Sequence, residues 1–75
     1  MEHEFTSISG TVENIVFRNE DNGWTVFEID SGDELVTAVG LLFQVSAGDT
    51  IKIMGEWVNH PSYGRQFRVE SYEKS

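Results

Sequence analysis

The side chains best suited to contact a phosphate or a nucleic-acid base lie in one short stretch of the last third of the chain. His60, Tyr63 and Arg65 occur close together, and Arg68 follows them. An arginine neutralises a phosphate, and a tyrosine ring offers a face on which a base can stack, which is worth about 1–3 kcal/mol per base. If this protein contacts nucleic acid, these four residues are the candidates that the sequence predicts.

The same side chains also allow a purely structural interpretation. Tyr63 would then cap a turn, and Arg65 would be solvated or paired with Glu56 or Glu70. Exposed charges of this kind are commonly solvated, and their ion pairs contribute about 0–1 kcal/mol. We favour this interpretation over a nucleic-acid contact.

The segments on both sides of this stretch show the alternation that is typical of half-buried strands. The alternating residues are Ile51, Ile53, Gly55 and Trp57 before it and Phe67, Val69 and Ser71 after it. Pro61 fixes its own φ and favours an extended His60, whereas Gly64 can adopt the positive φ that returns the chain. The sequence therefore predicts a hairpin with the candidate residues near its tip and Trp57 in the core.

The first long segment predicts a strand that changes its buried face. It covers about residues 5–18, and its apolar residues switch parity after Val12, because Ile15 and Phe17 lie on the other face. A β-bulge produces such a switch, and Gly10 tolerates a sharp bend nearby. A strand of this kind can serve both sides of a small closed barrel.

Two shorter strands follow, at 24–29 and 35–40, after the turn residues 19–23 and 30–33. The Asn-Gly pair in the first turn is a strong hairpin signal. The segment 41–48 is too short for a stable helix by itself, so we expect a loop or a single turn. Together with the hairpin, these strands predict an all-β, five-stranded Greek-key barrel of the OB type, with the usual helix between strands 3 and 4 reduced or absent.

Apolar residues occupy both faces of the second of these strands. Trp24 shares its parity with Val26, whereas Phe27 and Ile29 hold the other face. One face therefore belongs to the core and the other is expected to be covered by something else, so Trp24 is either a residue at the rim of the core or a candidate docking residue. Phe43 is a second docking candidate, although it would equally plug the open end of the barrel.

The composition indicates one small acidic domain. The chain has 75 residues, with 13 acidic and 5 basic side chains and a formal net charge of −8. Such a surface repels a polyanion on average, so DNA binding would be local, weak and strongly salt-dependent. An acidic surface also serves solubility alone. We expect residues 1–75 to form a single domain, with residues 1–4 and 74–75 frayed.

The sequence offers no catalytic residues and no metal site. It lacks the G-x-x-x-x-G-K-[ST] phosphate loop and any cysteine, and His3 and His60 lie far apart. No spacing singles out a Ser–His–acid triad. No apolar run approaches the roughly 20 residues of a membrane span, and the acidic start is unlike a signal peptide. We therefore expect a cytoplasmic protein, or a piece of one, without a cofactor of its own.

Two stretches of the sequence resemble one known family. Residues 10–26 run Gly-Thr-Val-Glu-Asn-Ile-Val-Phe-Arg-Asn-Glu-Asp-Asn-Gly-Trp-Thr-Val, and residues 55–67 contain the pattern His-Pro-x-x-Gly-x-Gln-Phe. Both are similar to the opening region of bacterial RecD-like ATP-dependent DNA helicases, which are like the alpha subunit of exodeoxyribonuclease V. The resemblance extends from about Ile8 to Tyr72, and the second stretch is its more specific part.

This resemblance implies an N-terminal OB-like domain placed ahead of a superfamily 1 motor that moves 5′ to 3′. ATP and Mg²⁺ are implied only for the parent helicase, whose catalytic residues have no counterpart in this sequence. Our leading hypothesis is a non-catalytic accessory domain, with the DNA-repair setting of that family, which organises the DNA path or docks on the motor. Its partners would be the remainder of the helicase and, weakly, single-stranded DNA. The alternative is a protein-interaction module without direct DNA contact.

Overall fold

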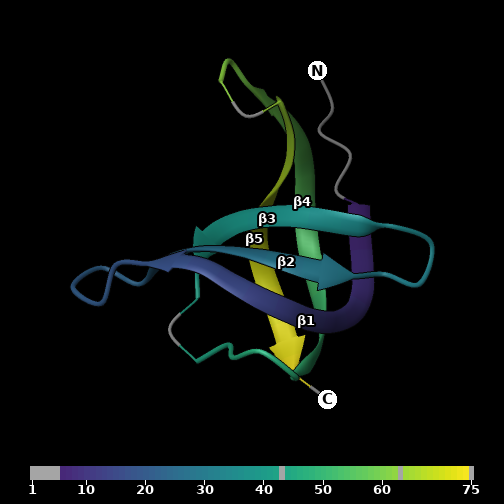
Figure 1. The fold of residues 1–75 in the computed structure, drawn as a ribbon, viewed down its shortest axis with the longest axis horizontal. Coiled ribbons are helices and arrows are strands. Elements are labelled where there is room, and N and C mark those ends of the chain that lie inside the picture. Colours follow the sequence, from purple (N-terminus) through teal and green to yellow (C-terminus); the bar gives the residue numbers. More distant parts are fainter. Residues whose placement is uncertain (1–5, 43, 63, 75) are drawn as a thin grey trace.

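Five strands close into a barrel in this protein (Figure 1). The computed structural model describes residues 6–42, 44–62 and 64–74. In chain order, the strands are β1 (Thr6–Arg18), β2 (Trp24–Asp30), β3 (Leu35–Leu41), β4 (Thr50–His60) and β5 (Gly64–Lys74). Around the barrel the order is β1-β2-β3-β5-β4, and β3 and β5 pair in parallel. The predicted all-β, OB-like architecture is confirmed. The described residues contain no helix that is long and apolar enough to cross a membrane.

β1 is long because it serves two neighbours. Its first half, up to Thr11, pairs with β4, and its second half pairs with β2. Gly10 lies where the partner changes, and an added Cβ there would be 2.1 Å from the carbonyl oxygen of Asp30, so only glycine fits. The predicted bulge is confirmed by the register shift between Val12 and Asn14.

A second bulge in β1 was not predicted. It lies between Ile15 and Phe17, and it places Phe17 beside Val26 on the outer side of the barrel. Phe17 is therefore 53% exposed, and the expectation that it shares a face with Ile15 was wrong. The extra residue, Val16, reverses the alternation between inside and outside once more.

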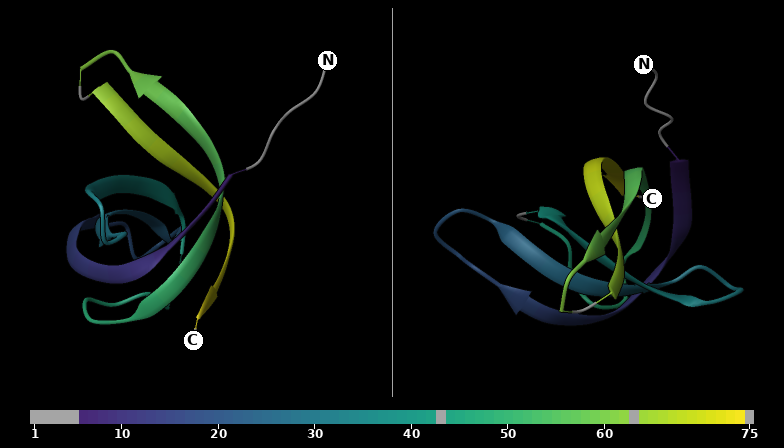
Figure 2. Two further views of the ribbon diagram at one scale, coloured as in Figure 1. Left: turned by 90° about the vertical axis from the view of Figure 1, so that its right-hand side faces the viewer. Right: turned by 90° about the horizontal axis from the view of Figure 1, so that it is seen from above.

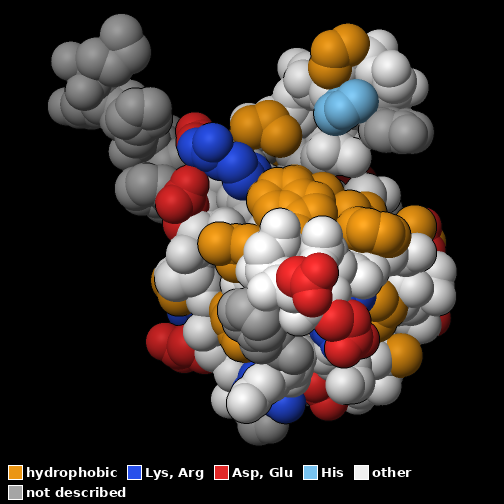
Figure 3. Space-filling model, turned by 90° about the vertical axis from the view of Figure 1, so that its left-hand side faces the viewer, with side chains coloured by type: hydrophobic (Ala, Val, Ile, Leu, Met, Phe, Trp, Pro, Cys, Tyr) orange, Lys and Arg blue, Asp and Glu red, His pale blue; other side chains and the backbone are white. Residues whose placement is uncertain are grey.

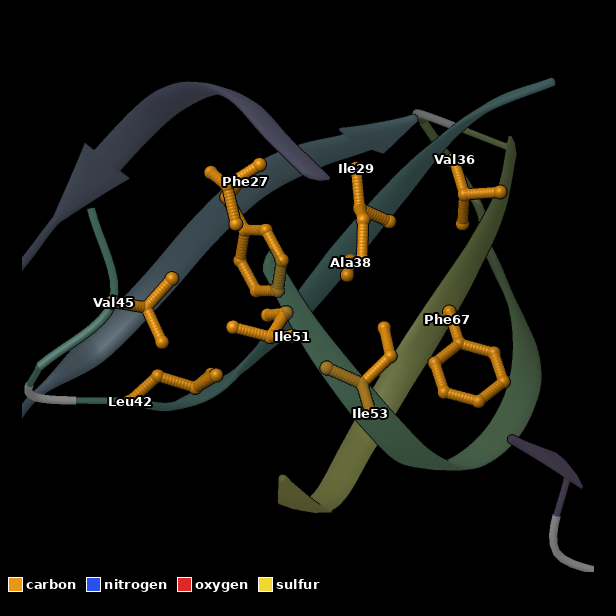
Figure 4. Packing of buried hydrophobic residues seen from close by; sticks show 10 residues of the cluster. Phe27, Ile29, Val36, Ala38, Leu42, Val45, Ile51, Ile53 and Phe67 are labelled. Atoms are coloured by element: carbon orange, nitrogen blue, oxygen red, sulfur yellow. The ribbon is translucent and has the colours of Figure 1, made fainter. Parts of the chain in front are cut away.

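The core is built from all five strands and from the segment that follows β3 (Figure 4). Its buried members are Val12, Phe27, Ile29, Val36, Ala38, Leu42, Val45, Ile51, Ile53 and Phe67. Full burial of one large apolar side chain stabilises a fold by about 1.5–3 kcal/mol. Among the described residues, every buried side-chain nitrogen and oxygen has a hydrogen-bond partner.

The described residues between β3 and β4 contain no helix, as the sequence predicted, and they close the barrel end where an OB-fold usually has one. Leu42 and Val45 are fully buried there. The Leu42 N–H donates to the carbonyl of Gly23, and the Arg18 guanidinium donates to the carbonyl of Val45. Phe43, which we expected to dock or to plug this end, lies outside the described residues.

β4 and β5 form a hairpin that projects beyond the rest of the barrel (Figures 1 and 2). The predicted hairpin is confirmed, and the pairing of its strands continues to His60 and Gly64. A register shift skips Glu70, so Tyr72 packs against the core and Ser71 is exposed, which is the reverse of the predicted alternation. β5 continues through Lys74, whereas we expected this residue to be frayed.

Candidate functional site

The outer side of β1, β2, β3 and β5 carries two neighbouring rows of side chains, and we call this surface the outer face. The apolar row consists of Phe17, Val26 and Val39 and ends at Arg68. The polar row consists of Asn14, Glu28 and Thr37 and ends at Gln66. Residues directly opposite each other on paired strands face the same side of a sheet, which is why side chains distant in sequence meet here.

A hollow of about 530 Å³ lies in the outer face. It is lined by Val16, Phe17, Val26, Glu28, Thr37 and Gln66. Its apolar part owes its exposure to the unpredicted bulge in β1, which turns Phe17 outward. This site was not predicted from the sequence, although the adjacent Val16 and Phe17 at the end of a long strand were a signal, since alternation cannot bury both.

Trp24 extends the outer face toward the turn between β1 and β2. It is paired with Leu41, and these two side chains are 39% and 62% exposed. A second hollow, of about 300 Å³, lies between Trp24 and Leu41 on one side and Val69 and Tyr72 of β5 on the other. The structure thus places Trp24, the predicted docking residue, among exposed apolar neighbours.

The space-filling view shows hydrophobic side chains gathered below the projecting hairpin, which is marked by the pale-blue histidine (Figure 3). Acidic side chains lie on the barrel next to this cluster. Contiguous exposed apolar surface of this kind, rimmed by polar groups, is typical of binding sites rather than of a free surface.

The hairpin holds its own candidate residues in internal contacts. The Arg65 guanidinium lies 3.8 Å from the centroid of the Trp57 ring. Trp57 in turn meets Phe67 edge to face, with centroids 5.2 Å apart. Cation–π contacts of this kind are worth about 0.5–1 kcal/mol at exposed sites. Trp57 is half-buried and packs against the core, so its predicted core position is confirmed in part.

His60 also has a local role. Its Nδ1 accepts a hydrogen bond from the N–H of Ser62 at 3.0 Å, which fixes the turn after Pro61. Gly64 then adopts the predicted positive φ of 82°. Tyr63, the predicted stacking platform, lies outside the described residues.

Arg68 makes the ion pairs that we had considered for Arg65. Its guanidinium contacts Glu56, and it lies 3.2 Å from the Glu70 carboxylate. One cation between two carboxylates leaves a net negative charge around Arg68. Arg68 is therefore poorly placed to attract a phosphate.

Two other cations stabilise the segment between β3 and β4. Arg18 donates to Val45, as described above, and Lys74 donates to the Gln44 carbonyl at 2.9 Å and lies 3.4 Å from the Asp49 carboxylate. The N–H of Ser46, and secondarily Lys74, hold the pKa of Asp49 below its usual value, although partial burial opposes them. These basic groups serve the fold.

No group of three or more His, Asp or Glu side chains in the described part of the chain converges as a metal site would require. The features that the structure does show are a closed barrel, an apolar hollow in its outer face and a hairpin beside it. This architecture agrees with the comparison to known families, in which residues 5–75 match the model described as "ATP-dependent DNA helicase YrrC, OB-fold domain". The chain belongs to this family of helicase OB-fold domains.

Proposed function

We propose that this protein is a non-catalytic accessory domain of a RecD-like helicase and that it docks on the remainder of its parent through the outer face. ATP, Mg²⁺ and the catalytic residues would belong to the motor of that parent. The family match supports the helicase setting, and the resemblance of the sequence to RecD-like enzymes supports the particular kind of helicase.

The observation that carries this proposal is the exposure of large apolar side chains on adjoining strands. Phe17, Trp24 and Leu41 are 53%, 39% and 62% exposed, and all three lie on the outer face. Removing apolar surface from water is favourable by about 25 cal/mol for each Å², and this gain offsets the entropy that association costs. A second protein surface would therefore gain free energy here.

A second candidate function is direct contact with single-stranded DNA. OB-folds hold single strands on the face of strands 2 and 3, between the loops that join strands 1 to 2 and 4 to 5. Phe17 and Trp24 offer aromatic rings on this face. Against this candidate stand the net charge of −8 and the pairing of Arg68 with two carboxylates.

The test is association of this 75-residue chain with the parent helicase from which the domain has been deleted, measured by isothermal titration. Trp24→Ala should weaken association about tenfold or more, since a half-exposed tryptophan would lose much of its buried contact area. The control is Leu35→Ala, because Leu35 is also exposed, at 56%, and lies on the same side of β3, but it stands at the other end of the strand from Leu41 and lines neither hollow. Unaltered association of the Trp24 variant would exclude docking through this face.

A further inference from the structure

We infer that the hollow in the outer face receives a basic, amphipathic polypeptide segment. One apolar side chain of that segment would lie on the apolar row, and a lysine or arginine would face Glu28. This inference rests on the proposed docking function and specifies the chemistry of the partner.

The apolar half of the hollow determines that the occupant has an apolar side chain. Val16 and Phe17 are 56% and 53% exposed, and Val26, which is paired with Phe17 and with Val39, also lines the hollow. The hollow, at about 530 Å³, has room for more than one side chain. Removing this surface from water is favourable only if the group that enters is itself apolar.

The polar half determines that the occupant also forms hydrogen bonds. Gln66 is only 9% exposed and lines the hollow, yet no hydrogen bond joins its side-chain amide to another described residue. Because every fully buried side-chain nitrogen and oxygen among the described residues has a partner, the Gln66 amide atoms must reach the hollow, where water or a ligand satisfies them. The Thr37 hydroxyl lies in the same row. Both groups suit the N–H and C=O groups of a polypeptide backbone.

The charge around the hollow determines the sign of the partner. Glu28 lines it, and its one hydrogen bond among the described residues is a long one, 3.4 Å, from the Asn14 amide. No described lysine or arginine pairs with Glu28. Arg68, at the end of the apolar row, is shared by Glu56 and Glu70. A cationic segment therefore complements this face, whereas a phosphate backbone would meet uncompensated negative charge.

The experiment is a titration of this chain, followed by amide NMR, with a synthetic amphipathic peptide of leucine and lysine about five helical turns long. Two further titrants are the same peptide with glutamate in place of lysine and a single-stranded oligothymidylate. We expect the lysine peptide alone to bind and to shift the amide signals of Val16, Val26, Glu28 and Thr37. Binding of the glutamate peptide with equal affinity, binding of the oligonucleotide to the same residues, or no binding of the lysine peptide would each overturn the inference.

Matched substitutions separate the hollow from general attraction to an acidic protein. Glu28→Gln should weaken the lysine peptide about three- to fivefold, as expected for one partly exposed charge pair. Asp33→Asn removes the same charge from an exposed turn outside the hollow and should change the affinity less than about twofold. Phe17→Ser should weaken binding about tenfold, and Leu35→Ser should not, because Leu35 is similarly exposed on the same side of the sheet but does not line the hollow. Equal effects within either pair would overturn the inference.

The two proposals fail in different ways. If Trp24→Ala weakens association with the domain-deleted helicase but the lysine peptide does not bind, docking stands and the partner chemistry is wrong. If neither measurement gives its expected result, the outer face is not a docking surface.

Discussion

The outer face and the β4–β5 hairpin both carry residues of the types that bind ligands, but they differ in whether those residues are available. On the hairpin, Arg65 covers Trp57 and the His60 imidazole accepts the Ser62 N–H. On the outer face, by contrast, Trp24 and Phe17 expose large apolar surfaces. This difference shows that the type of a residue makes it a candidate for binding a ligand, whereas the contacts that it already makes determine whether it is available to bind one.

The largest effect should come from Trp57→Ala, which tests whether the hairpin is held by its own contacts. This change removes the edge-to-face contact with Phe67 and the platform beneath Arg65. We expect a loss of about 2–4 kcal/mol of unfolding free energy, since Trp→Ala in a packed position costs about 3–5 kcal/mol and Trp57 is half-buried. Urea denaturation monitored by circular dichroism measures it.

Trp24→Ala is the matched control for that experiment. Because Trp24 is 39% exposed on the outer face, its loss should cost less than about half as much stability as the loss of Trp57. Equal losses of unfolding free energy in the two variants would contradict this distinction, since both tryptophans would then stabilise the fold.

Arg65→Met should have a smaller effect on the free energy of unfolding. It tests whether Arg65 serves the fold or binds DNA. If the guanidinium serves mainly to cover Trp57, the variant should lose about 0.5–1 kcal/mol of unfolding free energy, and its affinity for single-stranded DNA should not change. Fluorescence anisotropy of labelled single-stranded DNA at low salt gives the affinity. A clear drop in DNA binding by a folded variant would restore the hairpin as a nucleic-acid site.

The sequence predicted the strands well because their signals are local. The period-two rows, the turn around residues 19–23 and the Pro61–Gly64 loop all depend on neighbouring residues, and they define the barrel. The parity change after Val12 was also visible, because enough apolar residues stand on both sides of it to show two patterns.

What the sequence did not predict depends on single extra residues in β1 and β5. The bulge at Val16 turns Phe17 outward, and the bulge at Glu70 turns Tyr72 inward. Near the end of a strand, too few residues follow a bulge to establish a new alternation of apolar and polar residues. The sequence pattern therefore cannot locate the bulge. The adjacent Val16 and Phe17 indicated that one of them is exposed, but only the register shows which residues form the apolar part of the candidate site.

The partners of charged groups were equally hidden. Arg65 and Arg68 have similar sequence surroundings, with glutamates on the paired strand and in the following residues. Only the register, which pairs Glu56 with Arg68, decides which arginine is neutralised. The register between paired strands depends on the three-dimensional fold, and it cannot be read from a single sequence.

The smallest effect is expected at Asp49, whose carboxylate already makes contacts within the fold. This residue allows an engaged and an available carboxylate to be compared, as the arginines were above. Asp49 accepts the Ser46 N–H at 2.9 Å and contacts Lys74, which lowers its pKa in the folded state. A carboxyl group whose pKa is lower in the folded than in the unfolded state stabilises the fold at pH values above its unfolded-state pKa. This stabilisation is lost as the pH falls through the folded-state pKa. Asp49→Asn should therefore be less stable than the unsubstituted protein near neutral pH, and the difference should disappear in strong acid.

Glu28→Gln is the control, because Glu28 has no described cationic partner. Urea unfolding of both variants between about pH 2 and pH 7 spans the range over which carboxylates titrate. The glutamine variant should match the unsubstituted protein in stability and differ from it only in binding the basic peptide. An Asp49→Asn difference that persists unchanged into acid would show that this carboxylate acts through its shape and hydrogen bond rather than its charge. A pH-dependent loss in Glu28→Gln would show that the outer face, like the hairpin, serves the fold.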